Sequence, residues 1–178
     1  GNCMIDSHSH TLYSKHATGS VDELVRASIA AGVRILTITD HAPFSVDTNN
    51  RLLASELDGY FSDIEQARRA YQEQITILQG LEFDYMPEAE PFTRDLLARY
   101  PLDFAIGSVH YVAVPGEPMI KVWELPRLAD EAFLDRYFAY LEGLVDCGLF
   151  DAIGHADTLL RALPEDIFLR RFEPLLAP

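Results

Sequence analysis

Residues 35–41 read Ile-Leu-Thr-Ile-Thr-Asp-His, and this stretch decides the fold class. The run Ile35–Thr39 is rich in β-branched residues and too short for a helix, so it predicts a buried strand. A capping box over residues 20–23 precedes it and begins a predicted helix that ends near Gly32. A second amphipathic helix is predicted over residues 56–72. The decisive stretch is therefore a strand between two helices.

The same alternation extends in both directions along the chain. Further strands are predicted over Met4–Asp6, Ile75–Leu78, Phe104–Val109 and Phe150–Gly154, and further helices over about 91–100, 128–146 and 164–176. Strands that alternate with helices predict an α/β fold with a parallel sheet, because each return needs a crossover. The alternation leaves a doubly wound sheet and a barrel both open. A closed eight-unit barrel typically needs about 250 residues, more than this chain supplies.

The composition indicates one folded domain over residues 1–178, with a sizeable core and 48% hydrophobic residues. The chain carries 14 Lys and Arg against 28 Asp and Glu, a formal net charge of -14. A nucleic-acid binder needs a basic surface, so no nucleic-acid partner is expected, and an anionic membrane surface is disfavoured for the same reason. Divalent cations and positively charged substrates suit this charge.

The two cysteines, Cys3 and Cys147, are far apart, so neither a disulfide framework nor a zinc finger is expected. No apolar run approaches the roughly 18 residues of a membrane span, and the first residues lack a signal-peptide pattern. The expectation from these features is a cytoplasmic protein with no membrane partner.

The six histidines all lie in predicted loops or at the C-terminal ends of predicted strands. These are His8, His10, His16, His41, His110 and His155, and Glu82 stands at the corresponding end of the third strand. A lone histidine is most often a core or surface residue. Because the C-terminal ends of parallel strands form one common mouth, however, we expect these seven side chains to converge. His8 and His10 are two residues apart on an extended segment and so face the same way.

Imidazoles and a carboxylate without thiolates suit Zn, Mn or Fe. Six histidines and one glutamate exceed the four ligands of a single tetrahedral zinc, so two or three divalent ions are predicted. Ions about 3.5–4 Å apart can activate a water and hold both oxygens of a phosphoryl displacement. The residues therefore predict metal-dependent hydrolysis of a phosphate ester.

These motifs, taken in order, resemble those of the PHP (polymerase and histidinol phosphatase) family. They are His8-Ser9-His10, His16, Thr39-Asp40-His41, Gly80-Leu81-Glu82, Gly107-Ser108-Val109-His110 and Gly154-His155-Ala156-Asp157. Within the family, the histidinol-phosphate phosphatase branch is the most similar. The resemblance implies a distorted, TIM-like (βα)7 barrel with three metal ions at its C-terminal mouth, of which this chain shows about five βα units.

The resemblance also implies a role for each motif residue. His8, His10 and Glu82 would hold the first metal, and His16 and His41 the second. Glu82 would bridge to a third metal that His110 and His155 also bind. A hydroxide bridging two metals would attack phosphorus, and Arg161 would contact the substrate phosphate. The implied activity is a metal-dependent phosphomonoesterase that releases phosphate from L-histidinol phosphate in histidine biosynthesis.

The chain departs from the family pattern after the last motif. Family members continue with two further βα units that carry an Asp-x-His, whereas no histidine follows His155 here. The expectation is a domain without its C-terminal βα units, whose open sheet edges would favour a homo-oligomer. The alternatives are a PHP phosphoesterase for another phosphate ester and a truncated or degenerate module that binds metal without catalysis.

Four features outside the ligand set are open to more than one interpretation. Asp40 fits a structural hydrogen-bond acceptor better than a metal ligand, and Asp84 could shape the pocket. Lys15 could meet phosphate, although a lysine in a loop is usually solvated. The predicted loop over residues 115–126 contains Trp123 and is the candidate for substrate specificity.

Overall fold

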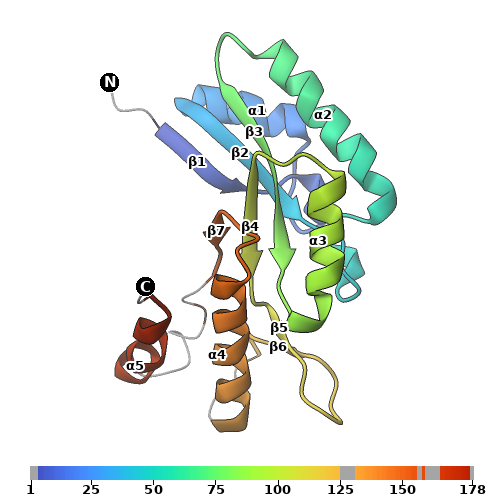
Figure 1. The fold of residues 1–178 in the computed structure, drawn as a ribbon. Helices are drawn as coiled ribbons and strands as arrows, with labels where there is room; N and C mark the ends of the chain where they lie inside the picture. The colour runs from blue at the N-terminus through green and yellow to red at the C-terminus, as the bar shows by residue number, and fades with distance from the viewer. Residues whose placement is uncertain (1–3, 125–130, 156–157, 159–164, 177–178) are drawn as a thin grey trace. The chain divides into compact units, whose positions relative to one another are not determined.

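The computed structural model describes residues 4–124, 131–155, 158 and 165–176 (Figure 1). The chain divides into two compact units. The first unit comprises residues 1–83 and 101–106, and the second comprises residues 84–100 and 107–178. Each unit is described by itself below.

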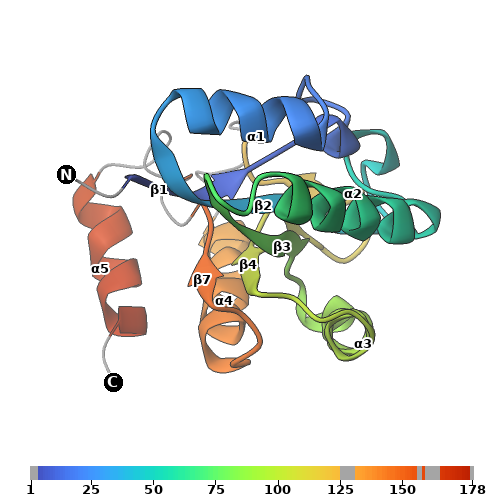
Figure 2. The ribbon, with the colours of Figure 1, turned by 90° about the horizontal axis from the view of Figure 1, so that it is seen from above.

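The first unit is built from parallel strands and two covering helices. Its strands follow the order β1 (Met4–Ser9), β2 (Val33–His41), β3 (Thr76–Asp84) and β4 (Phe104–Ser108), with the last residues of β3 and β4 belonging to the second unit. The helices are α1 (Val21–Ala30) and α2 (Leu57–Ala70), which pack against each other (Figure 2). Short 3-10 turns lie at Leu12–Ser14 (η1), Thr48–Asn50 (η2) and Ala54–Glu56 (η3).

The predicted capping box begins α1 as expected. The Ser20 side chain accepts a hydrogen bond from the backbone N–H of Glu23, and the Glu23 carboxylate reaches back to the Ser20 backbone. Gly32 lies between the end of α1 and the start of β2. Its φ of +84° is a backbone conformation that residues with a side chain rarely adopt. These two local signals set the length of the crossover between β1 and β2.

The strand register places two predicted ligands side by side. In the parallel pairing of β2 with β3, His41 lies opposite Glu82. On the other side of β2, Asp6 pairs with Leu36 and Ser9 with Ile38, so β1 carries an extra residue at this point. Such a bulge changes the direction in which side chains point, and it lies where β1 carries His8.

Gly80 allows the close packing of the neighbouring strands. A Cβ at this position would lie 2.6 Å from the carbonyl oxygen of Phe104 and 2.9 Å from Thr39 Cγ2. No side chain fits such a space. Glycine is therefore required two residues before Glu82.

Among its described residues, the second unit contains three helices, a two-stranded hairpin and a short strand. The helices are α3 (Glu90–Arg99), α4 (Glu131–Asp146) and α5 (Glu165–Leu176), and a 3-10 turn, η4 (Pro87–Ala89), precedes α3. The hairpin pairs β5 (Tyr111–Val112) with β6 (Ile120–Lys121) in antiparallel fashion. The strand β7 (Ala152–Ile153) adjoins the end of β4. One face of α4 is apolar and buried, with Tyr137 fully enclosed, whereas Val145 near its end is exposed.

The predicted α/β class with parallel strands is confirmed, and several element boundaries differ. Strands β1 and β2 are both longer than predicted, so that His8 and His41 lie within them. Strand β3 continues past Glu82 to Asp84, so Glu82 lies within the strand instead of beyond its end. The predicted loop over residues 115–126 contains strand β6, which pairs with β5 just before the loop; these two-residue strands are too short to leave a sequence pattern. The last strand is shorter than expected. Among the described residues, no helix combines the length and apolar character needed to cross a membrane.

Candidate metal centre

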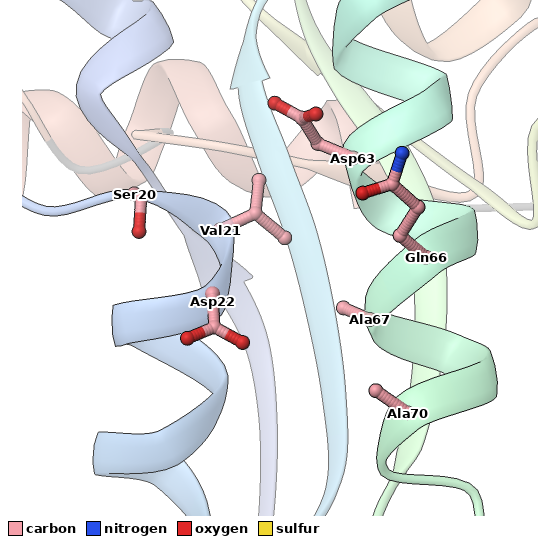
Figure 3. A pocket seen from close by; sticks show the side chains of 7 residues that line it. All are labelled: Ser20, Val21, Asp22, Asp63, Gln66, Ala67 and Ala70. Atoms are coloured by element: carbon pink, nitrogen blue, oxygen red, sulfur yellow. The ribbon is translucent and has the colours of Figure 1, made fainter.

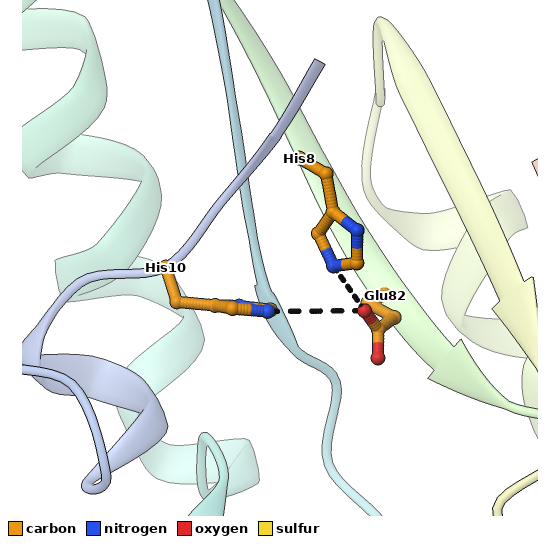
Figure 4. Close-up of side chains that lie close together, drawn as sticks. All are labelled: His8, His10 and Glu82. Carbon is orange, nitrogen blue, oxygen red and sulfur yellow. Dashed lines mark ion pairs between the residues drawn. The ribbon is translucent and has the colours of Figure 1, made fainter. Parts of the chain in front are cut away.

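The carboxylate of Glu82 lies at the centre of a group of imidazoles in the first unit. Its side chain has no exposed surface, and His8 Nε2 contacts Oε1 directly. His10 Nε2 lies 3.8 Å from the same oxygen (Figure 4), and His41 Nδ1 lies 3.2 Å from Oε2. The ligand atoms of His8, His10 and Glu82 all lie within 4.8 Å of one another, close enough to share one ion.

His16 completes this group from the loop that follows β1. Its ring centroid lies 5.6 Å from that of His10 and 5.2 Å from that of His41. The rings of His10 and His41 stack with centroids 4.7 Å apart. The first unit therefore brings together five of the predicted ligands, from two strand ends, one strand interior and one loop.

Hydrogen bonds around Ser14 determine which ring nitrogen of His10 carries the proton. The Ser14 hydroxyl donates to Asp40 Oδ1 at 2.7 Å, so its own hydrogen is used. His10 Nδ1 lies 3.4 Å from the same hydroxyl oxygen. Because the hydroxyl hydrogen is already used, Nδ1 must carry a hydrogen and donate it to this oxygen. This leaves the lone pair on His10 Nε2, which faces Glu82, as a metal-binding imidazole requires.

The environment also keeps the imidazole of His10 neutral. Burial lowers the pKa of His10 to about 4, assisted by the neighbouring His41, although Glu82 acts in the opposite direction. Burial and His41 likewise lower the pKa of His16. Because only the neutral imidazole has a lone pair to offer, both side chains are in the form that binds metal.

Asp40 holds the turn that carries His10 and His16. Its buried carboxylate accepts hydrogen bonds from the backbone N–H of Thr11 at 2.7 Å, the Thr11 hydroxyl at 2.8 Å and the Ser14 hydroxyl. Burial raises the pKa of Asp40, and these hydrogen bonds oppose the rise. The interpretation of Asp40 as a structural acceptor fits these contacts, which order the segment between the two histidines.

The second unit contains the two remaining predicted histidines. His110 and His155 lie with ring centroids 5.3 Å apart. Asp84 Oδ1 lies 2.8 Å from His110 Nδ1, a contact that leaves Nε2 of this ring with the lone pair. His155 adopts φ +53°, and the N–H of the preceding Gly154 donates to the carbonyl oxygen of Gly107 at 2.9 Å. A non-glycine residue in this conformation is uncommon and often marks a functional position.

The donor set fits divalent metal ions. In the first unit, the lone pair of His10 Nε2 and a carboxylate oxygen of Glu82 face each other over 3.8 Å, an arrangement that a cation between them would stabilise. Nitrogen and carboxylate donors without a thiolate suit Zn, Mn or Fe. The acidic chain adds a favourable field for cations.

Other sequence predictions have mixed outcomes. Arg161, the predicted phosphate contact, lies outside the described residues, as does Asp157, the last residue of the final motif. Lys15 Nζ pairs with Glu56 Oε1 at 2.6 Å, which does not fit a phosphate contact. The sequence predicts only that Asp84 could shape the pocket, whereas the structure places its carboxylate on His110 Nδ1. Asp84 follows Glu82 by two residues on one strand, so both side chains face the same side of the sheet. This spacing is the sequence signal for a second carboxylate near the predicted histidines.

A separate groove lies between α1 and α2 and contains none of the predicted ligands (Figure 3). Its two carboxylates are engaged by tyrosines: Tyr71 donates to Asp22 and Tyr13 to Asp63, each at 2.6 Å. Burial, together with Asp63, raises the pKa of Tyr13. These contacts join α1 and α2 to neighbouring segments, so the groove is distinct from the candidate centre.

Comparison with known sequences identifies a family and a set of relatives. The sequence profile of the PHP domain matches residues 6–176. The "Probable histidinol-phosphatase" of Deinococcus radiodurans is 35% identical over 158 residues, which cover 86% of this chain and 60% of the relative. The "Probable histidinol-phosphatase" of Schizosaccharomyces pombe is 29% identical over 91% of this chain and 58% of its own length. This chain thus spans about 60% of the length of these relatives.

Solved structures share the fold. The histidinol phosphate phosphatase HisK of Lactococcus lactis subsp. lactis Il1403, complexed with Zn, L-histidinol and phosphate, matches with a TM-score of 0.76 at 23% identity. The match covers 97% of this chain and 66% of the Lactococcus chain. The likeness shows an α/β fold of the TIM-like type found in that protein, with the strands of this chain forming part of it.

Proposed function

We propose, from the premise that this chain belongs to the PHP domain family, that it carries the metal centre of a phosphomonoesterase acting on L-histidinol phosphate. The observation that carries the proposal is the fully buried Glu82 carboxylate, which three imidazoles approach within 3.8 Å. The names of the Deinococcus relative and of the Lactococcus structure support the substrate. The reaction would release L-histidinol and phosphate in histidine biosynthesis, in the cytoplasm.

The proposed metal ligands are the seven predicted residues. His8, His10, His16, His41 and Glu82 would hold ions in the first unit, and His110 and His155 would hold an ion in the second, for two to three divalent ions in all. When bound, these ions would supply positive charge for the phosphoryl oxygens and activate the attacking water. Arg161 is the proposed contact for the substrate phosphate.

The chain's own residues prepare this chemistry. Ser14 and Asp40 hold His10 in the tautomer whose Nε2 is free of a proton, and Asp84 does the same for His110. Burial excludes water from Glu82, which strengthens its attraction for cations. The unprotonated Nε2 of His10 and the buried carboxylate of Glu82 thus form a preorganised cation site.

The test is phosphate release by the purified chain supplied with Mn²⁺ or Zn²⁺. We expect L-histidinol phosphate to be hydrolysed faster than p-nitrophenyl phosphate and glycerol phosphate, and chelation to abolish turnover. The variant Glu82→Gln should lower kcat/KM at least about 100-fold, because an amide cannot replace the charge of the carboxylate. The exposed Glu73→Gln makes the same chemical change and should have wild-type activity.

Two results would contradict the proposal. Metal-loaded protein with no turnover on any phosphate ester would favour a non-catalytic metal-binding module. Faster turnover of a different ester would keep the phosphoesterase and change the substrate.

A further inference from the structure

Trp123 is fixed beside His110 by the backbone of the hairpin β5–β6. Directly after β6, the N–H of Val122 donates to the carbonyl oxygen of His110 at 2.9 Å. The N–H of Glu124 then donates to the carbonyl oxygen of Lys121 at 2.9 Å, which closes a turn around Trp123. The indole is therefore held by main-chain bonds on both sides of its own residue.

The indole packs edge-on against the rings next to it. Its centroid lies 6.2 Å from that of His110, with the planes at 74°, and 5.8 Å from that of Tyr111. The ring of His155 also contacts that of His110, with the two centroids 5.3 Å apart. A large aromatic surface thus adjoins one proposed metal ligand, His110, whose ring in turn contacts a second, His155, within the same unit.

Trp123 is nevertheless 48% exposed, whereas the adjoining Tyr111 is 3% exposed. A single exposed apolar residue is common and by itself means little. Here the exposed ring is held in place by the backbone and lies beside the proposed reaction centre. A cation also lies near the ring, because Lys121 Nζ is 5.9 Å from the ring centroid. Ligand pockets are typically lined by aromatic side chains in such positions.

We propose that the exposed surface of Trp123 is a specificity surface that packs against a planar heteroaromatic ring in the leaving group of the substrate. The proposal rests on the proposed function and adds a substrate-selecting residue to it. A phosphate held near His110 and His155 would direct the rest of the ester toward the neighbouring indole. Lys121 beside the ring disfavours an ammonium group at this place, so the imidazole of histidinol phosphate, rather than its amine, is the group that Trp123 contacts.

A pair of substrates separates the imidazole from the amine. Ethanolamine phosphate has the aminoethyl phosphate part of L-histidinol phosphate and lacks the imidazole. In Trp123→Ala we expect KM for L-histidinol phosphate to rise about tenfold with kcat changed less than about threefold, while KM for ethanolamine phosphate stays at the wild-type value. Trp123→Phe should restore most of the loss. Phe92→Ala, which removes another exposed aromatic ring from the second unit, should change neither value.

Fluorescence gives a readout that does not depend on turnover. Trp123 is the only tryptophan of the chain, so its emission reports on this surface alone. In the Zn²⁺-loaded protein, L-histidinol should change the emission in a saturable way, and ethanolamine should leave it unchanged.

The results distinguish this inference from the proposed function. Wild-type KM for L-histidinol phosphate in Trp123→Ala, or an emission that both compounds change alike, would overturn the role of Trp123 and leave the phosphatase intact. A wild-type protein that hydrolyses no phosphate ester would overturn the proposed function. A saturable, histidinol-specific emission change would then still support the aromatic surface as a ligand site.

Discussion

Glu82 and His10 show how burial and hydrogen bonding prepare individual side chains for metal. Glu82 has no exposed surface and lies opposite His41 in the sheet register. His10 is fixed through Ser14 so that its unprotonated nitrogen faces the carboxylate. Removing such a carboxylate from water has a high energetic cost, which bound cations would offset.

The first prediction concerns the protonation of His10 in metal-free protein. Its lowered pKa means that the folded chain takes up this proton only near pH 4, whereas the unfolded chain takes it up near 6.5. The contribution of His10 to the free energy of unfolding is therefore fully present above pH 6.5 and is lost as the pH falls from 6.5 toward 4. NMR titration of the histidine ring protons should show one resonance with a midpoint near pH 4 that His10→Gln lacks. A full set of midpoints near 6.5 would contradict the described burial.

At the scale of elements, short turns and close strand contacts position the ligands. Asp40 at the end of β2 holds η1, and the glycine at position 80 lets the neighbouring strands approach β3. Each of these features can be removed without touching a proposed ligand.

Removing the Asp40 carboxylate should loosen the turn that carries His10 and His16. We expect Asp40→Ala to lower the free energy of unfolding by about 2–4 kcal/mol, because buried donors of Thr11 and Ser14 lose their acceptor. Metal affinity should fall about 10- to 100-fold. Urea unfolding and metal titration measure the two effects, and Asp40→Asn should recover part of both. Unchanged metal affinity in Asp40→Ala would exclude the positioning role.

Substitution of Gly80 tests the strand packing next to Glu82. Gly80→Ala should lower the free energy of unfolding by more than about 2 kcal/mol, since the added carbon meets the Phe104 carbonyl oxygen at 2.6 Å. Gly59→Ala in α2 is the matched control. Its added carbon meets only Tyr13 at 3.5 Å, so helix propensity should raise stability by up to about 1 kcal/mol. Equal effects of the two substitutions in thermal unfolding would refute the packing argument.

For the whole molecule, sequence patterns predicted the βα alternation and grouped the ligands by strand end. The strand prediction is confirmed for β2, because a short β-branched run between two helical segments has few interpretations other than a buried strand. It did not find the hairpin β5–β6, because its two-residue strands are defined by pairing rather than by periodicity. The role of Asp84 beside His110 and the tautomer of His10 depend on side-chain contacts that no sequence spacing encodes.

Metal binding by the stripped chain tests the central claim most directly. After chelation and dialysis, calorimetric titration with Zn²⁺ or Mn²⁺ should show two to three ions bound per chain, with a higher Tm in the loaded protein. Glu82→Gln should lose at least one ion, while the Tm of its metal-free form should not fall, because an amide is less costly to bury than a carboxylate. Glu73→Gln should bind as wild type does. If the wild type and Glu82→Gln bound no ion, or bound ions equally, Glu82 would not be the centre of a metal site.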